Sequence, residues 1–132
     1  MADLTALARW LDRYADAWRS NDPDRIGSLF TDDAVYRWHP YDEGESVAHG
    51  RNAIVRGWLE EPDAPDSWEM SLEPLAMTGD LGVARGLTTY AGGAEGGRTY
   101  HNIFVVRLDD EGNCFAFTEY YMLEPEASAA DA

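Results

Sequence analysis

The N-terminal stretch carries its apolar residues at helical spacing. Between residues 4 and 18 they recur three and four positions apart, while aspartate and arginine residues occupy the other side. This spacing predicts a helix that buries one face. The apolar positions are Leu4, Leu7, Ala8, Leu11, Tyr14, Ala15 and Trp18. Trp10 falls at the edge of this stripe, so we expect it at a pocket rim or against a partner.

Two shorter helices are predicted next. Asp22 is placed to cap the first of them, and Pro23 suits its first helical position. Its inner face of Ile26, Leu29 and Phe30 predicts about two turns. The second begins after Gly50 and ends before Pro62, because proline cannot continue a helix. Its apolar residues are Ile54, Val55, Trp58 and Leu59.

The rest of the chain alternates apolar and polar residues, which predicts strands. The strands cover residues 34–38, 68–77, 81–91, 100–108 and 114–123. A phase shift beyond Pro74 predicts a bulge, and residues 109–113 have the composition of a hairpin turn. We therefore expect an α+β domain over residues 1–123, with three N-terminal helices packed on a strongly curved antiparallel sheet. This arrangement forms a cone with an internal cavity, and residues 124–132 form a flexible acidic tail.

Composition narrows the classes of function. The chain has a net charge of −15, from 25 acidic and 10 basic residues, which disfavours binding to nucleic acid or to an anionic membrane. The N-terminal residues lack the pattern of a secretory signal, so we expect a cytoplasmic protein. The single cysteine, Cys114, excludes an internal disulfide. His39, His49, His101 and Glu119 lack the spacing of metal ligands, and we expect no metal or other cofactor.

Three sequence signatures together resemble the nuclear transport factor 2-like superfamily. They are Y-x3-W-x3-D-x3-I-x2-L-F-x-D-D-A from Tyr14, H-G-R-N-A-I from His49, and F-x-E-Y-Y from Phe117. Within this superfamily the pattern is similar to SnoaL-like polyketide cyclases, limonene epoxide hydrolases and ketosteroid isomerases. The resemblance covers roughly residues 4–122 and implies the cone fold described above. Its functional implication is broad, because this fold hosts isomerases, hydrolases, cyclases, scaffolds and binders.

The resemblance also implies catalytic positions. Tyr14 precedes Asp22 by eight residues, the spacing at which ketosteroid isomerases carry an oxyanion-hole phenol. His39 stands before Pro40, where those enzymes carry a carboxylate base, and Asn102 stands where they carry a protonated aspartate. Because both positions differ, we expect only trace isomerisation of a steroid ketone. Related cyclases and hydrolases tend to end their last strand in an aspartate, and here Glu119 is the nearest acid.

Two alternatives remain open for each proton-transfer group. Glu119 is either a cavity acid with a raised pKa or the partner of Arg85. His39 is either a general base or an inert residue at a strand end. Asn102 shares a predicted strand face with apolar residues and therefore needs a polar partner or a ligand. We expect an aromatic wall for a small hydrophobic ligand, made by Trp18, Tyr36, Trp38, Trp58, Phe104, Phe117 and Tyr121.

Three functions follow from these residues. The first is a cofactor-independent isomerase, cyclase or hydrolase, in which Tyr14 and Asn102 stabilise an oxyanion while His39 or Glu119 moves a proton. The second is a non-catalytic domain whose aromatic cavity only holds a ligand. The third is a dimeric interaction scaffold. We also expect a homodimer, because Ile103, Val105 and Tyr120 make the outer face of the predicted sheet apolar.

Overall fold

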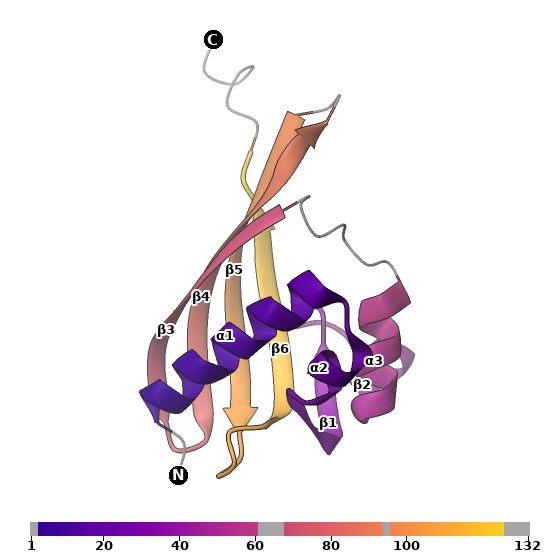
Figure 1. Cartoon of the computed structure of the whole chain (residues 1–132), viewed down its shortest axis with the longest axis vertical. Coiled ribbons are helices and arrows are strands. Elements are labelled where there is room, and N and C mark those ends of the chain that lie inside the picture. Colours follow the sequence, from indigo (N-terminus) through magenta and orange to yellow (C-terminus); the bar gives the residue numbers. More distant parts are fainter. Residues whose placement is uncertain (1–2, 61–67, 94–95, 126–132) are drawn as a thin grey trace.

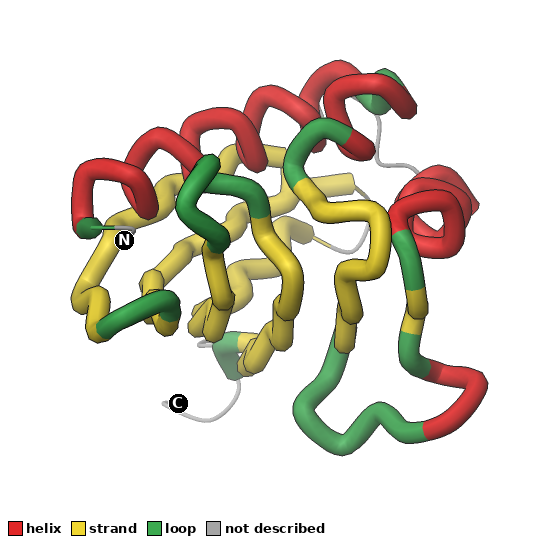
Figure 2. Tube along the Cα trace, turned by 90° about the horizontal axis from the view of Figure 1, so that it is seen from below, coloured by secondary structure: helices red, strands yellow, loops and turns green. Residues whose placement is uncertain are grey.

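The protein folds into a layer of helices on a curved sheet. A computed structural model describes residues 3–60, 68–93 and 96–125. In these residues the helices α1 (Leu4–Ser20), α2 (Pro23–Gly27) and α3 (Arg51–Glu60) lie on one side of the sheet (Figures 1 and 2). The strands are β1 (Phe30–Arg37), β2 (Ala48–His49), β3 (Trp68–Thr78), β4 (Leu81–Gly93), β5 (Gly96–Leu108) and β6 (Cys114–Leu123), and a short 3-10 helix, η1, spans Gly44–Ser46. The α+β architecture is as predicted, and the sheet is curved without closing.

Helix α1 crosses the sheet diagonally and buries a complete apolar face (Figure 1). Its buried residues are Leu7, Trp10, Leu11, Tyr14 and Ala17. The prediction that Trp10 lies at a rim is wrong, because the buried stripe is rotated toward it and away from Leu4, which is 45% exposed. The Trp10 indole is fully buried and donates a hydrogen bond of 3.0 Å to the Leu29 carbonyl oxygen.

Helix α2 begins where predicted but ends earlier. The Asp22 carboxylate accepts a hydrogen bond of 2.9 Å from the Asp24 backbone N–H, which confirms the predicted cap. The helix has five residues instead of two turns, and Phe30 opens β1. The Leu29 carbonyl accepts the Cys114 backbone N–H at 2.8 Å, so pairing with β6 draws this segment into the sheet.

The sheet has the order β2-β1-β6-β5-β4-β3. Strands β3 to β6 form an antiparallel meander, and the register shift between Pro74 and Ala76 confirms the predicted bulge. Strand β1 instead runs parallel to β6, with Tyr36 opposite Phe117, so the sheet is mixed where we predicted an antiparallel one. Two neighbouring strands this far apart in the chain are not joined by a hairpin, so local turns do not fix their direction.

The strand registers separate an inner face from an outer one. Asn102, Phe104 and Val106 alternate inward along β5 and are buried, as predicted. Ile103, Val105 and Tyr120 occupy the outer face, also as predicted, with Tyr120 44% exposed. The predicted tail extends beyond the described residues after position 125. Among the described residues, no helix combines the length and the apolar character that crossing a bilayer requires.

Candidate functional site

An aromatic cluster fills the space between α1 and the inner face of the sheet. Tyr14 lies at its centre and is only 1% exposed. Its ring packs on Trp58 at a centroid distance of 5.3 Å, on Phe104 at 5.1 Å and on Phe117 at 5.8 Å. Phe104 and Phe117 are equally buried, which places these two predicted wall residues deep in the core.

Several polar tips of this cluster are buried without a well-formed hydrogen bond. Within the described residues these atoms are the indole nitrogens of Trp18, Trp58 and Trp68 and the hydroxyl oxygen of Tyr36. The rings of Trp18 and Trp58 stack with their centroids 4.9 Å apart, and the centroid of the Tyr36 ring lies 6.3 Å from that of Trp58. A buried donor without an acceptor is unfavourable by a few kcal/mol, and native structures rarely leave one unpaired. The Trp18 indole lies against the Tyr14 hydroxyl, and the Trp58 indole lies against that of Tyr36, in contacts that fall short of a well-formed hydrogen bond. The cluster therefore gathers donors around two phenol oxygens and leaves them weakly paired.

A chain of polar side chains lies on the inner face of β4, β5 and β6. The Thr88 hydroxyl donates to the Asn102 side-chain oxygen at 2.9 Å, and the Asn102 amide donates to the Glu119 carboxylate at 2.9 Å. Thr88 and Asn102 are buried, and Glu119 is partly buried. The predicted polar partner of Asn102 is thus Glu119, and Thr88 fixes the orientation of the amide between them.

Burial raises the pKa of Glu119 from its ordinary value of 4.5 to about 7, although the hydrogen bond from Asn102 acts in the opposite direction. The pKa values of Tyr14 and Tyr36 are also well above the ordinary value, mainly through burial, with a further contribution from the Glu119 charge in both cases. Glu119 is therefore an electrostatic neighbour of both phenols. The raised pKa matches one part of the cavity-acid prediction, while the cavity itself stays a prediction. Arg85 instead pairs with Glu73 at 2.8 Å on the outer face.

A pocket of about 420 Å³ reaches the cluster from the side of α3. Its lining residues are Trp18, Trp38, Gly57, Trp58 and Glu60. Gly57 permits this arrangement, because a Cβ atom there would lie 2.5 Å from the Trp38 ring. The pocket thus exposes three predicted wall residues to an entering molecule.

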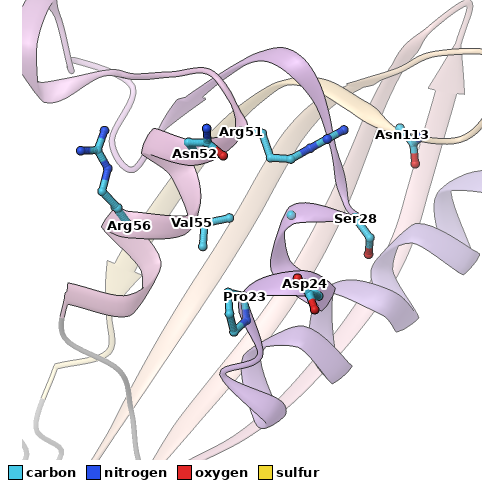
Figure 3. A pocket seen from close by; sticks show the side chains of 9 residues that line it. Pro23, Asp24, Ser28, Arg51, Asn52, Val55, Arg56 and Asn113 are labelled. Carbon is cyan, nitrogen blue, oxygen red and sulfur yellow. The ribbon is translucent and has the colours of Figure 1, made fainter.

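A second pocket, of about 710 Å³, lies between α2 and α3 (Figure 3). Its lining includes the polar residues Asp24, Ser28, Asn52 and Arg56. Arg51, which also lines it, donates to the Phe30 carbonyl oxygen at 2.8 Å and pairs with Asp32 at 2.7 Å, so its charge has a structural role. Neither this pocket nor the smaller one is lined by Tyr14, Asn102 or Glu119.

His39 lies in a separate polar group at the end of β1. Its Nδ1 is 3.2 Å from the Asp42 carboxylate, and its Nε2 is 2.9 Å from the Tyr121 hydroxyl. Tyr121 is therefore a partner of His39 as well as a member of the predicted aromatic wall. Sequence reasoning missed Asp42 and Thr88. Asp42 could have been found from its position three residues after His39. Thr88 could have been found from strand alternation, which places it on the inner face of β4.

The profile of the SnoaL-like domain matches residues 11–114, which is most of the chain. The protein belongs to the SnoaL-like domain family. No curated protein matches the chain significantly. Among solved structures, this SnoaL-like domain is similar to an NTF2-like protein of unknown function from Burkholderia xenovorans LB400, with a TM-score of 0.70 at 18% identity over 96% of this chain and 90% of that one.

Two further structures are similar to this SnoaL-like domain. An NTF2-like protein of unknown function from Mesorhizobium loti aligns with a TM-score of 0.64 at 20% identity, over 89% of this chain and 92% of that one. The other is SalBIII, an epoxide hydrolase/cyclase-like enzyme with a role in pyran ring formation in the polyether salinomycin. It aligns with a TM-score of 0.66 at 16% identity, over 92% of this chain and 95% of that one. These similarities establish the fold of this SnoaL-like domain.

Proposed function

We propose that this SnoaL-like domain binds a small, mainly apolar molecule that carries a carbonyl or epoxide oxygen, and that Glu119 transfers a proton to or from it. The observation that carries this proposal is the set of buried, weakly paired donors around two phenols that feel the charge of Glu119, a carboxyl group of raised pKa. The aromatic rings provide an apolar wall for the molecule, and the donors provide partners for its oxygen.

The chemistry follows from the two protonation states of Glu119. A group with a pKa near 7 is close to the optimum for a general acid or base at neutral pH. The hydroxyl of Tyr36 and the indole N–H groups of Trp18 and Trp58 are donors able to stabilise negative charge as it develops on the ligand oxygen. Tyr14 supports the same oxygen through its phenol. This combination suits a cofactor-independent isomerase, cyclase or hydrolase, and the similarity to an epoxide hydrolase/cyclase-like enzyme supports the last two.

A non-catalytic binding domain is the second candidate. The specific observation in its favour is the close packing around Tyr14, which is 1% exposed and contacts rings on several sides. Such a site holds a ligand at the indole end of the cluster without bringing it to Glu119.

One ketone distinguishes the two functions. We expect 1-tetralone to bind and to shift the indole N–H resonances of Trp18 and Trp58, whereas its oxygen-free analogue tetralin binds more weakly. The Tyr36→Phe variant should bind 1-tetralone about 2- to 10-fold more weakly, the effect of one hydrogen bond. If Glu119 is a base, the protein also catalyses exchange of the α-protons of 1-tetralone with deuterium in D2O.

The Glu119→Gln variant separates binding from proton transfer. We expect it to bind 1-tetralone with little change and to lose the exchange reaction. Binding without exchange in the wild-type protein would favour the non-catalytic domain. Equal affinity for tetralin and 1-tetralone would contradict the proposed role of the buried donors.

We also propose that the protein forms a homodimer through the outer face of its sheet. Ile103 and Val105 lie at the centre of this face. Around them, Leu87 is 41% exposed, Tyr120 is 44% exposed and Met122 is 72% exposed. An apolar surface of this kind on a chain with a net charge of −15 is typical of a contact between copies.

A further inference from the structure

A second group of hydrogen-bonded titratable side chains includes a residue from the same strand as Glu119. It consists of Asp42, His39 and Tyr121, which we call the Asp42–His39–Tyr121 relay. The Asp42 carboxylate is 8% exposed and accepts the backbone N–H of His39 at 3.0 Å through one oxygen. Its other oxygen lies 3.2 Å from the His39 Nδ1 atom, and the His39 Nε2 atom lies 2.9 Å from the Tyr121 hydroxyl.

These contacts determine where the protons are. A carboxylate only accepts hydrogen bonds, so the His39 Nδ1 atom must carry its proton toward Asp42. In neutral His39 the Nε2 atom is then an acceptor, and the Tyr121 hydroxyl donates to it. In the imidazolium form Nε2 donates instead, which frees the Tyr121 proton for another oxygen. The ring of Tyr41 stacks on that of His39, with ring centroids 5.0 Å apart and an interplanar angle of 12°.

The Tyr121 end of the relay lies on the same face of the sheet as Glu119. Tyr121 and Glu119 are two residues apart on β6 and therefore lie on the same face, with Cα atoms about 7 Å apart. Tyr121 also stands opposite Asn102, the residue that donates to Glu119. Its ring packs on Tyr100 at 5.7 Å, and the Glu119 charge contributes to the pKa of the Tyr121 phenol, which burial raises above the ordinary value.

We propose that the Asp42–His39–Tyr121 relay is the second acid–base group of this site, working on the same substrate as Glu119. This inference rests on the proposed function and narrows it to substrates that carry a hydroxyl nucleophile and an epoxide or carbonyl oxygen a few ångströms apart. Tyr121 is the catalytic residue that touches the nucleophile, and His39 and Asp42 act through it.

The proposed step balances without a cofactor. The substrate hydroxyl passes its proton to the Tyr121 oxygen while the Tyr121 proton moves to the His39 Nε2 atom. The substrate oxygen forms a bond to the electrophilic carbon, whose carbon–oxygen bond breaks, and protonated Glu119 gives its proton to the released oxygen. Imidazolium and carboxylate then remain, and one proton passes from His39 through Tyr121 and solvent to Glu119. Because the phenol never carries a full negative charge, a raised pKa is compatible with this role.

The relay makes Tyr121 reactive in a way that needs no substrate. Benzenesulfonyl fluoride tests this property, because the phenol oxygen forms a bond to sulfur, fluoride leaves, and the His39 Nε2 atom takes the phenol proton. Tyr120 is the matched control when the labelling is done at a protein concentration at which sedimentation shows a monomer, so that the proposed dimer contact does not cover it. It is adjacent on β6, faces outward, and is 44% exposed against 48% for Tyr121. Peptide mass spectrometry gives the rate at each tyrosine within the same wild-type sample.

We expect Tyr121 to react at least about tenfold faster than Tyr120, since general-base assistance is typically worth about 10²–10⁴ in rate. His39→Gln should reduce the Tyr121 rate to that of Tyr120, because a glutamine accepts a hydrogen bond but takes no proton. Asp42→Asn should reduce the labelling rate of Tyr121 partially. Equal rates at Tyr121 and Tyr120 in the wild-type protein would overturn the relay, and so would a folded His39→Gln protein in which Tyr121 stays fast.

Protection by a ligand tests whether the relay borders the Glu119 site. Saturating 1-tetralone should slow the labelling of Tyr121 and leave that of Tyr120 unchanged. Fast labelling of Tyr121 in the presence of bound 1-tetralone would place the relay outside the site and overturn its shared role. Labelling itself needs neither 1-tetralone nor Glu119, so a failure of the proposed function leaves the reactivity of Tyr121 as a separate result.

Discussion

Replacing Glu119 by glutamine should change how the stability of the protein depends on pH. The side chain of glutamine has the shape of a protonated glutamate, and its oxygen still accepts the hydrogen bond from Asn102. The variant therefore keeps the neutral form of residue 119 at every pH. The wild-type protein instead ionises this group as the pH rises through about 7, whereas in the unfolded chain the same group ionises near its ordinary value of 4.5.

The sign and size of the effect follow from these two values. Between pH 4.5 and 7 the folded state binds more protons at Glu119 than the unfolded state does, so the free energy of unfolding falls as the pH rises. The contribution of Glu119 is present below pH 4.5 and lost as the pH passes 7. A difference of 2.5 pKa units corresponds to a loss of about 3 kcal/mol.

Urea denaturation at a series of pH values between 4.5 and 8.5 measures this loss, with tryptophan fluorescence and circular dichroism as signals. We expect the two proteins to have similar stability at pH 4.5 and Glu119→Gln to be more stable by about 3 kcal/mol at pH 8.5. Glu69→Gln, at an exposed position on β3, is the matched control and should follow the wild-type curve. Parallel curves for wild type and Glu119→Gln across this range would refute a buried acid at position 119.

Three further outcomes are expected. Gly57→Ala should destabilise the protein by about 1–3 kcal/mol in urea melts, because the new Cβ would lie 2.5 Å from the Trp38 ring. Without this clash the same change in a helix would be stabilising, because alanine favours a helix more than glycine does. Asp22→Ala should lower the free energy of unfolding by about 1 kcal/mol through loss of the α2 cap, and an unchanged melting temperature would contradict that role. Sedimentation velocity at about tens of micromolar should show a dimer that Tyr120→Lys converts to monomer, and a wild-type monomer would contradict the proposed interface.

Local rules were enough to predict the three helices and five of the six strands of the described residues, whereas β2, in a segment predicted to be a loop, was missed. The stripe from Leu7 to Tyr14 has the period of a helix, and Asp22-Pro23 is a local start signal. Strand alternation has a period of two, so it groups Asn102 with Phe104 and Glu119 with Phe117 on one face, while the structure decides that this face is the inner one. These features depend on residues within a few positions of one another, which is why the sequence alone determined them.

Only the tertiary structure decided which groups meet. The partner of His39 is Tyr121, 82 positions later, and the contact exists because β1 lies parallel to β6 at the edge of the meander. The raised pKa of Glu119 depends on its burial in the folded chain, and the burial of Trp10 depends on the rotation of α1 against the sheet. Such contacts depend on how whole layers pack, and neither periodicity nor capping residues carry that information.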